Sequence, residues 1–521
     1  MTVELAVSAT EPGCLRTIAA ALDRAGPGDV VAVRPGTYRE ALEPHGDVRV
    51  VATGGAGTVI VTAVEGSAVT VTRGEVVLEG LVLRGAPGCD ALVQVGGGLL
   101  LLRDVDVDAD GWAGVQVTGG RLEAAGGRLA NRSGAALVVE GGTGAELTDV
   151  NIGPASTAGV VVTSPVGVSL RRSNVRPGGR HGVVVAGDGV ARLDTCVIGE
   201  ASVAGVLVHE RAAAELTDCH LEGPGDGVRA DGTARAFLLR ATLAGLGGDG
   251  LVAGGEAELV ATDCGLWDLR GRGVAASDRS GVTLTSVHVA RTAAAALTVR
   301  GAARVAASDL AVDDAGSAGL EVVGRAELSV DDLRVDGGVT GVLVAGLGRL
   351  RLRGVRVRRA EVALAVGGGD VRVQDLEAQD CGTGVRLDRS ARAVVDSGLF
   401  HRCGTGVHVH GEAEAVLRSV TVEDSGTTGV TVDSGAVLAA RRCRVARSQS
   451  DGVRLLPGAT ATVTECELVA NQGAGLAVLT TADVLLSGGS IHGNRGDDVL
   501  APPGHHLVVD GTRLGDGARR I

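Results

Sequence analysis

Two histidines stand two residues apart in a Val-His-Val-His run at residues 407–410. Residues two apart in an extended strand lie on the same face, so the side chains of His408 and His410 point to the same side. Asp388 and Asp433 occupy the position of His410 in the preceding and following segments of a repeating pattern. Imidazoles flanked by carboxylates predict an acid/base pair or a site for a divalent metal.

Arginines occupy the position of His408 in neighbouring segments, at Arg386 and Arg454, with Thr431 between His408 and Arg454. Because a guanidinium binds a carboxylate through two hydrogen bonds, these arginines favour an acidic substrate. The alternative is an exposed row of charges that screen one another and have no chemical role. The candidate catalytic residues are His408, His410, Asp388, Asp433, Arg386 and Arg454, and the candidate metal ligands are His408 and His410. No cofactor other than a divalent metal is indicated.

The element that would position these residues is a repeat. A glycine followed by an apolar residue recurs every 22 or 23 residues over much of the chain, for example at Gly159, Gly182, Gly205, Gly227, Gly250 and Gly273. The residues after each glycine alternate with the period of two that is typical of a half-buried strand. The period is too short for a crossover helix, so the sequence predicts an all-β parallel β-helix solenoid of roughly 20 coils.

Composition fits a narrow solenoid interior. The chain has 84 glycines, 1% aromatic residues and no lysine. The nine cysteines include pairs 22 or 23 residues apart, such as Cys196 with Cys219 and Cys443 with Cys466, which predicts small buried thiols stacked in coil after coil. The net charge of −13 argues against binding nucleic acid or an anionic membrane. Without a recognisable leader or a long apolar stretch, a cytoplasmic location is expected.

The first residues differ from the repeat. Leu15, Ile18, Ala19 and Leu22 have helical spacing, and the Gly-Pro-Gly-Asp segment at 26–29 ends the pattern. A helix over the unpaired edge of the first coil would protect that edge from aggregation. We therefore expect a strand and helix cap over residues 1–46 and the parallel β-helix over residues 47–521.

The start of the chain and its later coils resemble known proteins. The Pro-Gly-Asp segment at 27–29 and the Pro-Gly-Thr-Tyr-Arg-Glu segment at 35–40 are similar to the cap of right-handed parallel β-helix proteins of the pectin-lyase-like superfamily, and the later coils resemble its carbohydrate-binding and sugar-hydrolase repeats. The cap also resembles the β-helix part of actinobacterial proteins fused to an AAA-type ATPase. This chain has no phosphate-binding Gly-x-x-x-x-Gly-Lys motif, so such an ATPase would be a separate partner.

Two classes of function remain open. The resemblance leads us to look for the catalytic motifs of pectin methylesterases and polygalacturonases, and this chain lacks the complete set of either enzyme. The first expectation is therefore a non-catalytic cytoplasmic scaffold that binds a protein partner. The alternative is a carbohydrate-active lyase, hydrolase or epimerase that uses His408 and His410. The open C-terminal coil or a lateral face would bind the partner or a second copy of the chain, and neither nucleic acid nor a membrane is expected to bind.

Overall fold

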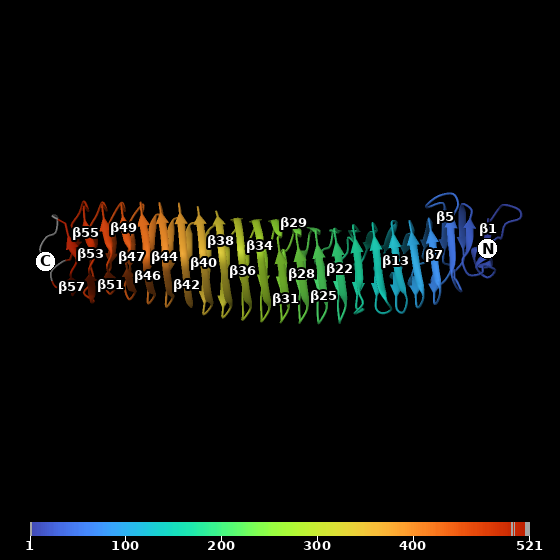
Figure 1. The fold of residues 1–521 in the computed structure, drawn as a ribbon, viewed down its shortest axis with the longest axis horizontal. Helices are drawn as coiled ribbons and strands as arrows, with labels where there is room; N and C mark the ends of the chain where they lie inside the picture. The colour runs from blue at the N-terminus through green and yellow to red at the C-terminus, as the bar shows by residue number, and fades with distance from the viewer. Residues whose placement is uncertain (1–2, 502–503, 505, 516–521) are drawn as a thin grey trace. The chain divides into compact units, whose positions relative to one another are not determined.

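The computed structural model describes residues 3–501, 504 and 506–515. The chain divides into two compact units, residues 1–265 (unit 1) and 266–521 (unit 2). Both are parallel β-solenoids, as Figure 1 shows from the strand arrows within each unit, and the described residues form about 22 turns. The expected all-β parallel β-helix is confirmed. In the described part of the chain, no helix has the length and apolar character needed to cross a membrane.

A coil of unit 1 consists of three strands: β21 (His181–Val185), β22 (Val190–Asp194) and β23 (Val197–Ile198). The next coil repeats them as β24 (Ala204–Val208), β25 (Ala213–Thr217) and β26 (His220–Gly223). Each strand pairs in parallel with its counterpart one coil later. The first strand of each coil belongs to sheet B and the other two belong to sheet A.

The periodic glycines are explained by close packing inside the coil. Gly159 lies on β18 (Ala158–Val162), and a Cβ atom there would come within 2.7 Å of Val175 Cγ1 and 2.8 Å of the Gly182 carbonyl oxygen. Gly182 and Gly205 meet equivalent obstacles from the following coil. Only a residue without a side chain fits, so the repeat seen in the sequence marks where the strand of sheet B approaches its neighbours most closely.

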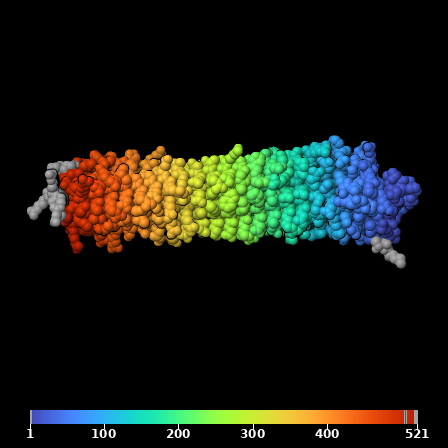
Figure 2. All heavy atoms as spheres, turned by 90° about the horizontal axis from the view of Figure 1, so that it is seen from above, coloured from blue at the N-terminus to red at the C-terminus, as the bar shows by residue number. Residues whose placement is uncertain are grey.

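Stacked side chains fill the interior. Cys196 and Cys219 are buried and donate their thiols to the carbonyl oxygens of Leu170 and Leu193, each at 3.5 Å. In unit 2, Val287 pairs in register with Leu310, and both are buried. Eight of the nine cysteines are buried, which confirms the prediction of core thiols. Within each unit the colours of Figure 2 change gradually, because each coil packs mainly on the coils before and after it.

The turns between strands carry a second kind of stack. Asp149 and Arg172 both adopt positive φ, at 57° and 47°, and the Arg172 guanidinium donates two hydrogen bonds to the Asp149 carboxylate at 2.9 and 2.8 Å. Aspartate tolerates this backbone region better than most residues. The hydrogen bonds from Arg172 lower the pKa of Asp149. Arg402 and Asp380 repeat the arrangement in unit 2.

The N-terminal segment already contains coil strands. Helix α1 (Ile18–Leu22) lies between β1 (Glu4–Val7) and β2 (Asp29–Val33), which pair with each other. Strand β2 also pairs in parallel with β4 (Val48–Ala52), and β3 (Gly36–Arg39) pairs in parallel with β5 (Val59–Thr62). Regular pairing therefore begins before residue 47, inside the segment that the sequence suggested as a cap.

The helix of that segment is short and held at its start. Thr17 caps it by accepting a hydrogen bond from the Ala20 amide at 3.2 Å. The Glu40 carboxylate accepts hydrogen bonds from the amides of Ile18 and Ala19 at 2.9 and 2.7 Å. Glu40 thus satisfies donors that a helix N-terminus leaves open.

Candidate functional site

The predicted exterior row lies on four successive strands of sheet B in unit 2: β43 (Thr383–Leu387), β45 (Thr405–Val409), β47 (Val430–Val432) and β50 (Val453–Leu455). Arg386 pairs in register with His408, His408 with Thr431, and Thr431 with Arg454. These four residues are called the exterior row below. Their inward neighbours are buried valines and leucines, so the alternation read from the sequence is the observed one.

Two imidazoles meet on one carboxylate oxygen beside this row. His408 Nε2 lies 2.9 Å and His410 Nδ1 lies 2.8 Å from Asp433 Oδ2. The His410 side chain is 60% exposed and that of Asp433 only 19%. His410 and Asp433 directly follow their strands, and the Asp433 amide donates to the Val409 carbonyl at 2.8 Å, which continues the pairing of the coils.

The electrostatics of the three residues fix their proton positions. Burial acts to raise the pKa of Asp433, but the hydrogen bonds from His408 and His410 outweigh it and hold that pKa below its usual value. An ionised carboxylate only accepts hydrogen bonds, so His408 Nε2 and His410 Nδ1 must each carry a proton. This leaves Nδ1 of His408 and Nε2 of His410 as the nitrogens able to accept a proton from another molecule when the rings are neutral.

The other three predicted residues do not join this cluster. Asp388 forms its ion pair with Arg386, 3.2 Å from the guanidinium Nε, and not with a histidine. Arg454 donates from Nε to Asp451 at 2.7 Å and from Nη2 to Ser450 Oγ at 2.9 Å. Of the six candidates, His408, His410 and Asp433 therefore form one site, while the two arginines flank it in register, already paired with other groups.

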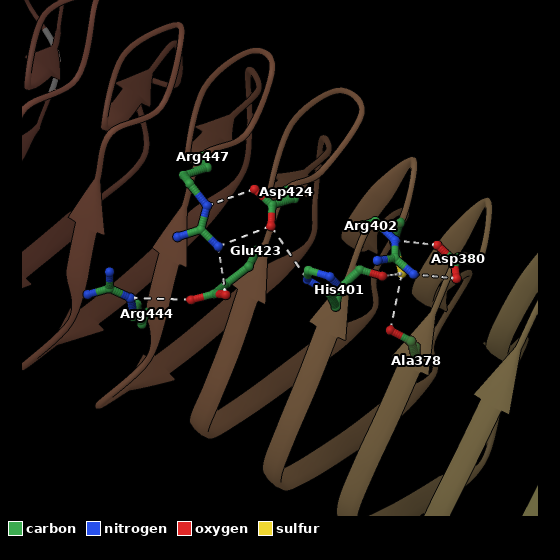
Figure 3. A network of polar contacts seen from close by, with 9 residues as sticks. Ala378, Asp380, His401, Arg402, Glu423, Asp424, Arg444 and Arg447 are labelled. Carbon is green, nitrogen blue, oxygen red and sulfur yellow. Dashed lines mark hydrogen bonds and ion pairs between the residues drawn. The ribbon is translucent and has the colours of Figure 1, made fainter.

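A different group comes together as possible metal ligands. In the described part of the chain, the group of three whose ligand atoms all lie within 4.8 Å is His401, Glu423 and Asp424 (Figure 3). His401 ends β44 (Arg392–His401) in sheet A, where its Nδ1 lies 3.5 Å from Asp424 Oδ2.

Arginines already neutralise the two carboxylates of this group. Arg447 donates from Nε to Asp424 Oδ1 at 2.7 Å and from Nη2 to Glu423 Oε2 at 2.8 Å, and Arg444 Nε lies 3.6 Å from Glu423 Oε1 (Figure 3). These hydrogen bonds raise the pKa of Arg447. A divalent cation would have to displace the guanidinium of Arg447, so this network is better explained as ion pairing. The metal role predicted for His408 and His410 stays a prediction.

One pair of residues that sequence reasoning missed repeats the same chemistry. His288, on β34 (Gly281–Thr292), places Nε2 2.6 Å from Oδ2 of Asp313, on β36 (Arg304–Ala315). The Trp267 ring contacts the His288 ring edge to face, with centroids 5.6 Å apart. The spacing of 25 residues between His288 and Asp313 equals that between His408 and Asp433. A search of the sequence for a histidine followed 25 residues later by an aspartate, which is one coil plus two residues, would have identified both pairs.

Comparison with solved structures finds distant similarity. The PL6 family alginate lyase AlyGC is 9% identical with a TM-score of 0.31, covering 95% of this chain and 98% of that chain. The periplasmic alginate epimerase AlgG is 11% identical with a TM-score of 0.27, covering 68% and 78%. The pre-mature bacteriophage phi29 gene product 12 is 10% identical with a TM-score of 0.35, covering 96% and 71%. Such values give no information on substrate or mechanism.

Among curated proteins, no sequence matches this chain. The family model described as "Right handed beta helix region" matches residues 158–332, 272–445, 340–491 and 428–519. These overlapping matches run from residue 158 to residue 519 and cover more than half of the chain. With the parallel coils of both units, they establish that this chain belongs to the right-handed β-helix family.

Proposed function

We propose that this chain is a carbohydrate-active protein whose reacting groups are His408, His410 and Asp433. The observation that carries the proposal is the convergence of two imidazoles on one carboxylate oxygen, at 2.9 and 2.8 Å, on an accessible face. A carboxylate that orients an imidazole is a recurrent device for general acid/base catalysis. The substrate class comes from the sequence resemblance to carbohydrate-active coils and from the flanking arginines.

The proposed mechanism assigns the two histidines opposite roles. Asp433 holds both rings with a proton on the nitrogen that faces it, so Nδ1 of His408 or Nε2 of His410 accepts a proton from the substrate. The other ring, when protonated, delivers a proton to the oxygen of the leaving group. Arg386, whose Nε pairs with Asp388 at 3.2 Å, stands one strand spacing from His408, about 4.8 Å, and would exchange that partner for the carboxylate of an acidic sugar. This scheme is that of a lyase; in an epimerase the second ring would return the proton to the same carbon, and in a hydrolase the first ring would take its proton from water.

The test is a panel of acidic and neutral polysaccharides, with new chain ends, unsaturated ends and epimerised residues measured separately. We expect the wild type to modify an acidic polymer, and the Asp433→Asn variant and the His408→Gln/His410→Gln double variant to lose about 100-fold or more of that activity. His209→Gln is the matched control, since His209 is a half-buried histidine of unit 1 outside the site. Equal activity in all variants, or none in the wild type on the whole panel, would contradict the proposal.

A second candidate, the non-catalytic scaffold, is favoured by a specific feature of unit 1. Val161, Val184 and Leu207 occupy there the position that the exterior row has in unit 2, in register and half-buried. An aliphatic stripe on a solvent-facing sheet is typical of a surface that binds another protein. A partner recovered in stoichiometric amount and cross-linked to this stripe, and lost with Val184→Asp, would support the scaffold.

Three further expectations stay predictions within this proposal. The cytoplasmic location, a separate ATPase partner and docking through the C-terminal coil each depend on observations other than the fold. The docking prediction falls partly on residues 516–521, which lie outside the described part of the chain. The last described strands are β57 (Leu507–Asp510) and β58 (Arg513–Leu514).

A further inference from the structure

Most arginine side chains whose contacts are described in unit 2 are ion-paired with a carboxylate of a neighbouring coil. Arg291 donates two hydrogen bonds to Asp268 at 2.6 and 2.9 Å, and Arg402 donates two to Asp380 at 2.6 and 2.7 Å. Such pairs suit a surface on which every outward side chain lies beside its counterparts one coil before and one coil after. An arginine that has another arginine as its counterpart departs from this arrangement.

Arg351 and Arg372 are such a departure. Arg351 lies on β40 (Arg349–Arg358) and Arg372 on β42 (Asp370–Gln379), directly opposite each other in register, and both are exposed. Their next counterparts along the row are Ser329 and Val394. In the part of the chain that the structure describes, no carboxylate forms an ion pair with either guanidinium.

The two arginines line a hollow in the surface of sheet A. The hollow has a volume of about 230 Å³, and its lining consists of Arg349, Leu350, Arg351, Asp370 and Arg372. Arg349 reaches Glu327 only at 3.6 Å. Asp370, the one carboxylate of the lining, is in register with Arg349 and not with Arg351 or Arg372. The hollow is thus lined by three guanidinium groups and one carboxylate, and it has room for several water molecules.

We infer that Arg351 and Arg372, assisted by Arg349, bind a tetrahedral oxyanion of the phosphate or sulfate type. Like charges directly opposite each other on neighbouring strands destabilise the sheet, and a bound anion removes that repulsion. Guanidinium groups have the planar donor geometry that matches two oxygens of such an anion. In a chain of net charge −13, this is a local site for anions and not a general property of the surface.

This site is independent of the proposed catalytic function. It lies on sheet A, whereas His408 lies on sheet B of the same unit, and His410 and Asp433 directly follow strands of sheet B. A phosphate or sulfate group can reach this site from two sources, as a free inorganic ion or as an anionic group carried by a polymer. Failure of one site therefore has no consequence for the other, and the experiment below includes both sources.

The experiment is calorimetric titration of the full chain with inorganic phosphate, inorganic sulfate and a sulfated oligosaccharide, at constant ionic strength set by sodium chloride. The double variant Arg351→Gln/Arg372→Gln is compared with Arg291→Gln/Arg402→Gln, which removes the same charge from arginines already paired with aspartates. We expect saturable binding by the wild type and the control variant, and at least tenfold weaker binding by Arg351→Gln/Arg372→Gln. Equal weakening in both variants, or no binding by the wild type, would overturn the inference.

Thermal unfolding supplies a second readout that also shows whether each variant is folded. Phosphate should raise the midpoint of the wild type and of the control variant, and should leave that of Arg351→Gln/Arg372→Gln unchanged. A midpoint raised equally in all three proteins would contradict the site. Tighter binding of the oligosaccharide than of free sulfate would identify a polymer as the source, and equal binding per sulfate would identify the free ion.

Discussion

Two stretches of one row of sheet B, one in each unit, differ in chemistry. The stretch in unit 1 is Val161, Val184 and Leu207, and the stretch in unit 2 is the exterior row, Arg386, His408, Thr431 and Arg454. The inward residues beside both stretches are alike, with valine fully buried at Val183 and at Val407. The coil geometry is therefore maintained by inward residues, and the outward positions are free to vary in chemistry.

The largest effect should come from an inward residue of unit 2. Phe400 is fully buried, and its neighbour Leu399 on the same strand points outward and is 41% exposed. We expect Phe400→Ala to lower the free energy of unfolding by about 3–5 kcal/mol, since it leaves a cavity. Leu399→Ala should cost less than about 1 kcal/mol. Urea denaturation of both variants measures this, and similar losses would contradict the division between inward and outward residues.

A smaller, pH-dependent effect should follow from Asp433, which lies beside the exterior row of unit 2 and contacts His408 of that row. Its pKa is lowered in the folded chain, so its ionised form stabilises the fold above the unfolded pKa of about 3.9. That contribution is lost as the pH falls through the folded pKa. We expect Asp433→Asn to be less stable than the wild type by about 1–2 kcal/mol near neutral pH.

The comparison of the two proteins by urea denaturation from neutral to strongly acidic pH checks the sign of this effect. The difference in free energy of unfolding should shrink as the pH falls, because the wild type then also lacks the carboxylate charge. Asp451→Asn provides no clean control, since Asp451 is hydrogen-bonded to the Ala474 amide. Asp396→Asn is preferable, as Asp396 forms one exposed ion pair with Arg418. A difference that grows in acid would be incompatible with the lowered pKa.

Exchanging the outward residues of the two stretches should change the free energy of unfolding still less. Val184 and His408 occupy the same position of their coils and are both half-buried. We expect Val184→His and His408→Val each to change the free energy of unfolding by less than about 1 kcal/mol. Thermal unfolding of the two variants measures the change. Loss of the folded state in either one would show that the outward row also determines the coil.

The smallest effect concerns the inward thiols, which should behave alike in both units. Cys196 and Cys219 in unit 1 and Cys443 and Cys466 in unit 2 are all buried, whereas Cys14 is half-exposed. We expect a thiol reagent to modify Cys14 alone in the native protein and all nine cysteines in denaturant. Mass spectrometry of the labelled chain gives the count. Rapid native labelling in one unit only would reveal that its coils open more readily.

The sequence predicted the fold well because its signal is local and repeated. Alternation after each periodic glycine placed Val407 inward and His408 outward, and the glycine itself marks a position where Cβ would collide, as at Gly159. These features depend only on residues close in sequence and on the coil period.

The candidate site was predictable only in part, because contacts between coils depend on side-chain direction. Asp388 and Asp433 were equivalent in sequence, yet Asp433 contacts both histidines and Asp388 turns to Arg386. The pairing of Arg351 with Arg372 was missed because those residues are 21 positions apart, which departs from the usual period. Where coil length varies, the register follows from strand pairing and cannot be read by counting.

Because each coil stacks mainly on the coils next to it, the number of coils between two sites sets the distance between them. Within unit 2, gain or loss of one whole coil between Arg372 and His408 would leave each local environment nearly unchanged. The separation between the oxyanion site and the histidine pair would change by one step of about 4.8 Å. Duplication or deletion of a 21- to 23-residue segment would therefore change the distance between the two sites and leave the residues of each site unchanged.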